Sequence, residues 1–329
     1  MYFAYVIVLT CRKALAKDED EESLVETLCS HWTFGVYADR DMQVSIMSIE
    51  GYTIRNAQRH EVDLIISWAN LEGWNPGIHD AETFYRTDPN GFFLGISDGK
   101  PVASISAVAY NDSFGFMGFY IVQPSFRGKG LGTEVWNAGI KYLGGRNIGL
   151  DSVQEQQRLY ERLGFLPCYK SVRHQGVGTG QESKAEGIKY LSEVPIEDLL
   201  TYDDQHFPVP RHVFTNSWIG QTGGIALASV NDGALRGYGL LRQCYLGYKI
   251  GPLFADDEDV AESLFQALCG HAPQGAQVFL DTPLPNSAAL DLAGRHHMHP
   301  VFETVRMYSK EEPYLPMEQI YGVTSFELG

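Results

Sequence analysis

The sequence has few cysteines and no long apolar run, and these absences exclude several classes of protein. Its five cysteines are scattered and none forms a Cys-x-x-Cys pair, so we expect neither a disulfide framework nor a zinc knuckle. This usage is typical of a reduced, intracellular protein, and we expect a cytoplasmic location. The cysteines are Cys11, Cys29, Cys168, Cys244 and Cys269.

No segment of the sequence is long and apolar enough to cross a membrane. The apolar stretch at residues 2–10 is too short to span a bilayer. No positive charge precedes it, and Arg12 and Lys13 come after it, so we do not expect a signal peptide. The sequence therefore predicts no membrane association.

Basic residues are also scarce. The chain has 25 lysines and arginines against 41 acidic residues, and its formal net charge is −16. This charge disfavours nonspecific binding to nucleic acid. A chain of 329 residues, 44% of them hydrophobic, is long enough for two domains with cores of their own. Nothing in the sequence indicates an oligomeric state.

Residues 1–48 differ from the rest of the chain. An apolar decapeptide is followed by the acidic run at residues 18–22 and by a short helical pattern. Translation could start at Met42 or Met47. We therefore expect an N-terminal extension outside the domains, whose order the sequence does not determine.

The chain does contain a strand, a glycine-rich turn and a helix between Gly118 and Leu143. Residues 118–123 are apolar and rich in strand formers, Pro124 ends that run, and an amphipathic helix begins near Leu131. The glycines leave N–H groups free to face a ligand, and the helix N-terminus and two basic side chains add positive charge. A plain surface turn is the alternative. The pattern predicts a pyrophosphate site made of Arg127, Gly128, Lys129, Gly130, Leu131 and Gly132.

Two other phosphate-binding loops fit less well. A P-loop requires Gly-x4-Gly-Lys-Ser/Thr, but Lys129 is followed by Gly130. A Rossmann turn requires Gly-x-Gly-x-x-Gly, and the third glycine is missing whether the count starts at Gly128 or at Gly130. Asp151 lies 21 residues after Gly130, where a ribose-binding acid is expected. A Rossmann site therefore remains an alternative.

The turn resembles the acetyl-coenzyme A motif of the GNAT acetyltransferase superfamily, Arg/Gln-x-x-Gly-x-Gly/Ala, through Arg127, Gly130 and Gly132. Over residues 52–174 the predicted order β-α-α-β-β-β-α-β-α-β is also similar to the GNAT fold. The resemblance implies a mixed α+β domain at residues 49–174, with a central, mostly antiparallel sheet flanked by helices. It further implies an N-acetyltransferase that uses acetyl-CoA as co-substrate and no metal.

The second half of the sequence repeats the first, because three short strings recur in order at a nearly constant offset. We expect a glycine-rich linker at residues 175–187 and a second GNAT-like domain at residues 188–329. Four acids at residues 256–259 stand where this copy would need a phosphate turn, and carboxylates repel phosphate. The second domain is thus predicted to be degenerate. The matching strings are Gly118–Ile121 with Gly247–Ile250, Leu150-Asp151 with Leu280-Asp281, and Val172-Arg173 with Val305-Arg306.

By resemblance to the family, Ile121 and Val122 supply main-chain hydrogen bonds to the pantetheine, and Tyr160 is the general acid that protonates the leaving thiolate. Simple packing is the other interpretation of Tyr160. The family often places a glutamate on the strand before the turn, but Met117–Tyr120 contains no acid. Asp151 at a strand end is the candidate base, acting directly or through water. A turn-stabilising role for it, with deprotonation by bulk water, is equally open.

Trp74, His79 and Phe84 lie where the family has its substrate-side helices and loop. They are candidates for the acceptor pocket, with ordinary packing as the alternative. The acceptor is expected to be an amine of a small molecule or a peptide. A noncatalytic acyl-CoA-binding sensor or scaffold is the alternative function. No cysteine or glutamate near His296–His299 completes a ligand set, so we expect no metal site there.

Overall fold

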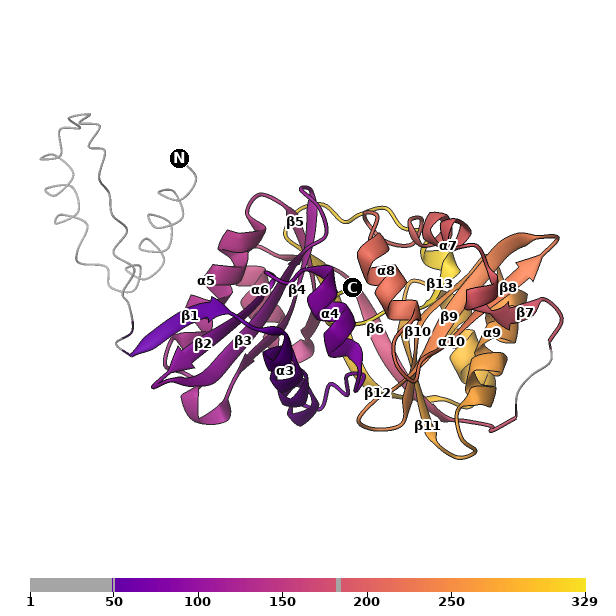
Figure 1. The fold of residues 1–329 in the computed structure, drawn as a ribbon, viewed down its shortest axis with the longest axis horizontal. Helices are drawn as coiled ribbons and strands as arrows, with labels where there is room; N and C mark the ends of the chain where they lie inside the picture. Colours follow the sequence, from indigo (N-terminus) through magenta and orange to yellow (C-terminus); the bar gives the residue numbers. More distant parts are fainter. Residues whose placement is uncertain (1–48, 50, 182–184) are drawn as a thin grey trace, which may run out of the picture. The chain divides into compact units, whose positions relative to one another are not determined.

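A computed structural model describes residues 49, 51–181 and 185–329, and the predicted N-terminal extension lies outside them. The described chain forms two halves with the same order of elements (Figure 1). We call the elements β1 to β6 the first half and β7 to β13 the second half. None of the helices described here is long and apolar enough to cross a membrane.

The first half has the predicted order of elements. In chain order they are β1 (Tyr52–Asn56), α3 (Arg59–Leu71), α4 (Asp80–Thr87), β2 (Phe92–Ser97), β3 (Lys100–Ala109), β4 (Phe114–Val122), the 3-10 turn η1 (Pro124–Phe126), α5 (Leu131–Leu143), β5 (Asn147–Val153), η2 (Gln154–Gln156), α6 (Gln157–Arg162) and β6 (Leu166–Val177).

The second half repeats this order, as the recurring strings predict, and adds a short strand at its end. Its elements are β7 (Ile188–Tyr190), η3 (Leu191–Glu193), α7 (Ile196–Asp203), α8 (His212–Ile219), β8 (Ile225–Asn231), β9 (Ala234–Gln243), β10 (Tyr248–Ala255), α9 (Glu258–His271), β11 (Gln277–Pro283), α10 (Ser287–Arg295), β12 (His299–Tyr308), η4 (Met317–Gln319) and β13 (Ile320–Gly322).

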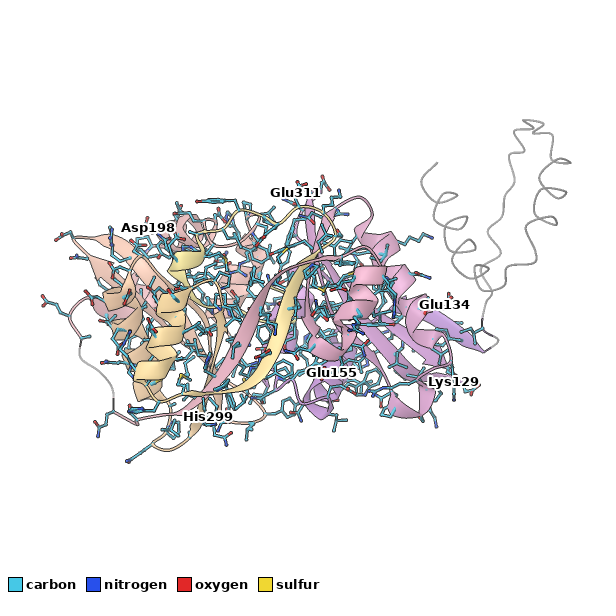
Figure 2. The ribbon with its side chains drawn as sticks, turned by 180° about the vertical axis from the view of Figure 1, so that it is seen from behind. Lys129, Glu134, Glu155, Asp198, His299 and Glu311 are labelled. Carbon is cyan, nitrogen blue, oxygen red and sulfur yellow. The ribbon has the colours of Figure 1, made fainter. Side chains whose placement is uncertain are left out.

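The two halves share one 13-stranded sheet and exchange their last strands. The strand order is β1-β2-β3-β4-β5-β12-β6-β11-β10-β9-β8-β7, with β13 paired to β10. The last strand of the second half, β12, therefore pairs with β5 of the first half, and β6 of the first half pairs with β11 of the second. Seen from behind, β6 and β12 are the long pink and yellow strands that cross the middle of the molecule (Figure 2).

Two buried ion pairs join the exchanged strands to their new neighbours, and they explain two of the repeated strings. Arg173 of β6 lies opposite Asp281 of β11, and its Nε and Nη2 donate to the carboxylate at 2.6 and 2.8 Å. Arg306 of β12 lies opposite Asp151 of β5 and donates to it at 3.0 and 2.7 Å. Each half thus supplies one arginine and one aspartate to the exchange.

Helices cover both faces of the sheet, and one core continues from one half into the other. On the face toward the viewer in Figure 1, α4 lies between α3 and α8 of the second half. Phe84 of α4 stacks on Trp218 of α8 with ring centroids 5.7 Å apart. Both side chains belong to one buried cluster with Phe119 of β4. The helices α5 and α6 pack in a separate cluster of the first half, and α9 and α10 in one of the second.

Asp80 is the first residue of α4; its carboxylate accepts from the Gly77 N–H at 2.8 Å and pairs with Arg242 of β9 at 3.1 Å. One boundary differs from the sequence prediction. The strand β6 continues to Val177, three residues into the predicted linker, because it is paired with β11 up to that residue. Residues 182–184 of the predicted linker lie outside the described residues.

The last described segment runs from the second half back into the first. After β13, residues 323–329 are all buried, and we call them the terminal segment. The Val323 N–H donates to the Asp281 carbonyl at 2.9 Å, and the Tyr110 hydroxyl donates to the Leu328 carbonyl at 2.8 Å. Leu328 also belongs to the buried cluster around Phe119. The segment is therefore held at both of its ends.

Candidate active site

The strands β4 and β5 separate part of the way along their length. They pair in parallel from Phe114 to Met117 on β4, and no β4–β5 pairing follows within the described residues. Just beyond that point, the pairing of β4 with β3 shifts in register, and Phe119 has a positive φ of 48°. The Ser104 hydroxyl of β3 donates to the Phe119 carbonyl at 2.9 Å and holds this bulge. The result is an open gap between two strands of the sheet.

The glycine-rich turn follows directly after this gap. Gly128 and Gly130 have φ values of 74° and 81°, which other residues rarely adopt. No hydrogen bond within the described residues uses the N–H of residues 128, 129 or 130, and the N–H groups of Leu131 and Gly132 at the start of α5 are free by helix geometry. A Cβ on Gly132 would lie 2.5 Å from the Tyr120 hydroxyl, so a larger residue there would require the Tyr120 side chain to move. The turn therefore offers a row of N–H donors at a helix N-terminus, which suits a phosphate group.

A cavity of about 720 Å³ connects the gap with the turn. Six of the eight predicted cofactor-binding residues line it, and Leu131 and Lys129 do not. Leu131 is buried against the other side of the turn, and Lys129 lies with its ammonium 5.1 Å from the Phe126 ring centroid at the outer edge of the first half (Figure 2). The six residues that line the cavity are Ile121, Val122, Arg127, Gly128, Gly130 and Gly132.

Arg127 is positioned by two contacts at the mouth of the cavity. Its Nε donates to the Val122 carbonyl at 2.8 Å, and its Nη2 pairs with the Glu72 carboxylate. Glu72 follows the last residue of α3 and also lines the cavity. The side chain of Arg127 is half exposed, so its guanidinium is accessible to an anionic ligand.

Tyr160 lies on α6 and closes one wall of the same cavity. Its ring packs against Trp136 of α5 and Phe165, with centroids 5.3 and 6.4 Å away. Its hydroxyl has no hydrogen-bond partner among the described residues, and burial raises the pKa of Tyr160 well above its ordinary value. The phenol therefore keeps its proton at neutral pH and faces the cavity as a donor.

Asp151 also borders the cavity, but its carboxylate is engaged elsewhere. The side chain is fully buried, and both oxygens accept from Arg306 of β12. Burial raises the pKa of Asp151, and the Arg306 charge offsets part of that rise. Asp281 has the equivalent place and the equivalent partner in the second half. This geometry favours a structural role for Asp151 over the predicted role as base.

The three residues predicted for the acceptor pocket lie in different surroundings. Trp74 is half-buried and lines the cavity. Phe84 is fully buried and stacks on Trp218, so it belongs to the core. His79 is exposed at the start of α4 and does not line the cavity.

The second half supplies cavity residues that the sequence did not indicate. They come from β12 and from the terminal segment, which lie more than 120 residues after the turn in sequence. The sequence contains one indirect indication of these residues. Because β4 lacks the acid that the family often places there, a catalytic base would have to come from another part of the chain. These residues are Phe302, Thr304, Phe326 and Glu327.

The corresponding gap in the second half is filled. There β10 and β11 pair in parallel only from Tyr248 to Ile250 on β10, as β4 and β5 do in the first half. Beyond that point β13 pairs with β10 instead, with Leu253 opposite Gly322. A Cβ on Gly322 would lie 2.6 Å from the Leu280 side chain of β11, which shows how tightly β13 fits. The acidic turn that follows β10 uses Asp257 to cap α9, at 2.9 Å from the Val260 N–H.

Comparison with known proteins identifies both halves. A sequence profile described as "Acetyltransferase (GNAT) family" matches residues 59–165, and one described as "Acetyltransferase (GNAT) domain" matches residues 199–322. The holothin acyltransferase of Pseudoalteromonas sp. (strain SANK 73390) is 31% identical over 280 residues, which cover 84% of this chain and 95% of that protein. The uncharacterized N-acetyltransferase YitH of Bacillus subtilis (strain 168) is 26% identical over 65% of this chain and 76% of its own length.

Solved structures show the same fold. A putative acetyltransferase from Pyrococcus horikoshii superposes with a TM-score of 0.73 at 21% identity, over 90% of this chain and all of that one. A tandem GNAT protein from the clavulanic acid biosynthesis pathway superposes with a TM-score of 0.58 at 13% identity, over 79% of this chain and 99% of that one. Together with the profiles and the 31% identity to an acyltransferase, this fold shows that the chain belongs to the acyl-CoA-dependent GNAT acyltransferases, as a member with tandem GNAT domains.

Proposed function

We propose that the protein transfers an acetyl group from acetyl-CoA to a primary amine. One observation carries this proposal: the gap between β4 and β5, the glycine-rich turn and the Tyr160 hydroxyl all open onto a single cavity. The turn would bind the pyrophosphate through its free N–H groups and Arg127. The pantetheine would lie in the gap beside Ile121 and Val122, where β4 has lost its strand partner.

In this arrangement Tyr160 acts at the end of the reaction. The amine nitrogen attacks the thioester carbonyl carbon, and the carbon–sulfur bond breaks. The phenol gives its proton to the departing thiolate and regains one from the nitrogen that has become the amide. A neutral phenol is required at the start; a tyrosine is neutral at pH 7 in any case, and burial raises the pKa of Tyr160 further.

The walls of the cavity on the acceptor side are aromatic. Trp74, Phe302 and Phe326 line the cavity together, and the Arg173 guanidinium lies over the Phe302 and Phe326 rings. We therefore expect an amine attached to an apolar or aromatic body, whether a small molecule or a peptide. The name of the Pseudoalteromonas relative points to holothin, which belongs in the set of acceptors to be tested.

The function is tested by the release of free coenzyme A from acetyl-CoA, measured with a thiol reagent, in the presence of a panel of primary amines that includes holothin. We expect release that depends on one class of amine, and mass spectrometry should show that amine acetylated. Tight acetyl-CoA binding without transfer to any amine would instead indicate a noncatalytic acyl-CoA-binding protein.

Replacing Tyr160 with phenylalanine should lower kcat about tenfold or more, because general-acid catalysis typically contributes ~10²–10⁴-fold. The ring and its packing against Trp136 remain, so the dissociation constant of acetyl-CoA should change little. Tyr314, which is 95% exposed, provides the matched control, and Tyr314→Phe should leave kcat unchanged. An unchanged kcat in Tyr160→Phe would return this residue to a packing role.

Isothermal titration should give one acetyl-CoA bound per chain. The second half has no open gap, since β13 occupies the place between β10 and β11, and its turn is acidic. Asp259→Arg should leave the stoichiometry at one, because removing one acid does not displace β13. Two equivalent sites per chain would show that the second half binds coenzyme A as well.

A further inference from the structure

Glu327 reaches the cavity from the terminal segment, next to the bulge in β4. Its carbonyl oxygen lies 2.1 Å from the position that a Cβ on Gly118 would take. Any side chain at position 118 would therefore collide with the terminal segment. The space beside Gly118 that a side chain would occupy is taken by the terminal segment, and Glu327 lines the cavity.

The carboxylate of Glu327 is buried without a hydrogen-bond partner. The residue is 3% exposed, and its Oε2 is fully buried with no donor in reach. No hydrogen bond to Oε1 is found within the described residues either. A buried carboxylate without a donor is energetically costly, so this arrangement suits a group that receives its donor from a ligand.

The charged groups around Glu327 do not supply that donor. Arg173 of β6 is bonded to Asp281 of β11 and to the Trp74 carbonyl. Arg242 of β9 and Lys249 of β10 act on Glu327 only through their charge, and in the described part of the chain the Lys249 ammonium and both Nη atoms of Arg242 have no hydrogen-bond partner. Arg173, Arg242, Lys249 and Asp151 are the charged side chains close enough to interact electrostatically with Glu327.

Three other carboxylates line the cavity, and each is less suited to take a proton from the acceptor. Glu72 pairs with Arg127 at the glycine-rich turn. Asp151 is bonded to Arg306 through both oxygens. Glu155 of η2 is exposed to solvent. Glu327 is the only one of the four that is both buried and unpaired among the described residues.

We infer that Glu327 is the general base of the transfer reaction and binds the acceptor as an ammonium ion. This inference rests on the proposed function. The catalytic site of the first half is then completed by the last residues of the second half, which explains how β4 can lack an acid.

The protons balance as follows in this scheme. One N–H proton of the bound ammonium moves to the Glu327 carboxylate, and the neutral amine attacks the thioester carbonyl carbon. When the carbon–sulfur bond breaks, Tyr160 protonates the sulfur and takes the remaining excess proton from nitrogen. Glu327 then releases its proton to solvent when the products leave, so the net reaction yields one amide, one thiol and one proton.

The variant Glu327→Gln tests the inference with the full chain and the best amine of the panel. At pH 7 we expect kcat/KM for the amine to fall by about 10²–10⁴-fold. We also expect a changed pH profile: the wild-type rate should be nearly flat around neutral pH, whereas the rate of the variant should rise about tenfold per pH unit toward the pKa of the amine. The dissociation constant of acetyl-CoA should be unchanged.

Two further variants separate this role from others. Glu327→Asp should retain the flat pH profile at a reduced rate. It replaces Glu327→Gln as the test variant if Glu327→Gln does not fold. Glu318→Gln, exposed in the preceding η4, should behave as wild type. A lower melting temperature with an unchanged pH profile would make Glu327 purely structural. A steep profile in Glu155→Gln, with none in Glu327→Gln, would overturn the assignment in favour of Glu155.

Failure of the proposed function has a different signature. A wild-type enzyme that acetylates no amine of the panel overturns the proposed function, and the assignment of Glu327 as base falls with it. An active wild type whose rate and pH profile survive Glu327→Gln overturns the assignment of Glu327 alone.

Discussion

Arg127→Glu is expected to weaken the binding of acetyl-CoA about 100-fold, which corresponds to about 2.7 kcal/mol. The substitution removes a charge-assisted hydrogen bond to phosphate, worth about 1.5–3 kcal/mol, and places a carboxylate beside Glu72 at the mouth of the cavity. Two negative charges would then face the pyrophosphate where the structure now has a pair of opposite sign. Titration calorimetry with acetyl-CoA measures the effect directly.

Two comparisons show whether the effect is local. Lys141→Glu makes the same change in net charge on the exposed face of α5, near the end of the helix opposite to the turn, and should shift the affinity less than about twofold. Lys129→Glu should have an intermediate effect, because Lys129 lies in the turn but outside the cavity wall. An affinity equal to that of the wild type in Arg127→Glu would refute the placement of the pyrophosphate at this turn.

Arg173→Met should lower the free energy of unfolding by about 3–5 kcal/mol, the usual effect of leaving one partner of a buried ion pair alone. Both side chains of the pair are at most 3% exposed. The substitution leaves the Asp281 carboxylate without its two donors and removes the hydrogen bond to the Trp74 carbonyl. Equilibrium unfolding in urea, monitored by tryptophan fluorescence, measures the loss.

The same strand provides the control for this prediction. Lys170 of β6 pairs with Glu303 of β12 at 3.2 Å, but these side chains are 46% and 39% exposed. Lys170→Met should therefore cost no more than about 1 kcal/mol. If the two variants lost the same free energy of unfolding, burial would not make the Arg173–Asp281 pair more stabilising than an exposed pair. That result would contradict our account of how the halves are joined.

The local part of the site could be predicted from the sequence, because it depends on neighbouring residues. The turn from Arg127 to Gly132 has its chemistry in six consecutive positions, and the alternation of strands and helices around it follows from apolar spacing. Tyr160 was found through its resemblance to a family motif, and the structure does place it on the cavity. Its role as acid remains a prediction.

The nonlocal part could not be predicted. The sequence shows that Asp151 recurs as Asp281 and that Arg173 recurs as Arg306, but not that each aspartate pairs with the arginine of the other half. Strand pairing between distant segments leaves no periodic signal in either strand. For the same reason Asp151 was open to interpretation as a base, and Glu327 could not be connected with Gly118, 209 residues earlier.

The exchange of β6 and β12 has a consequence for how the protein folds during its synthesis on the ribosome. Domains usually fold one after another as they emerge during synthesis. Here one edge of β5 stays unpaired until β12 emerges. Both edges of β6 stay unpaired until β11 emerges, and its second edge is paired only after β12 follows. The nascent first half therefore keeps open strand edges while more than a hundred further residues are synthesised. In this state a new chain is prone to aggregation and to binding by chaperones.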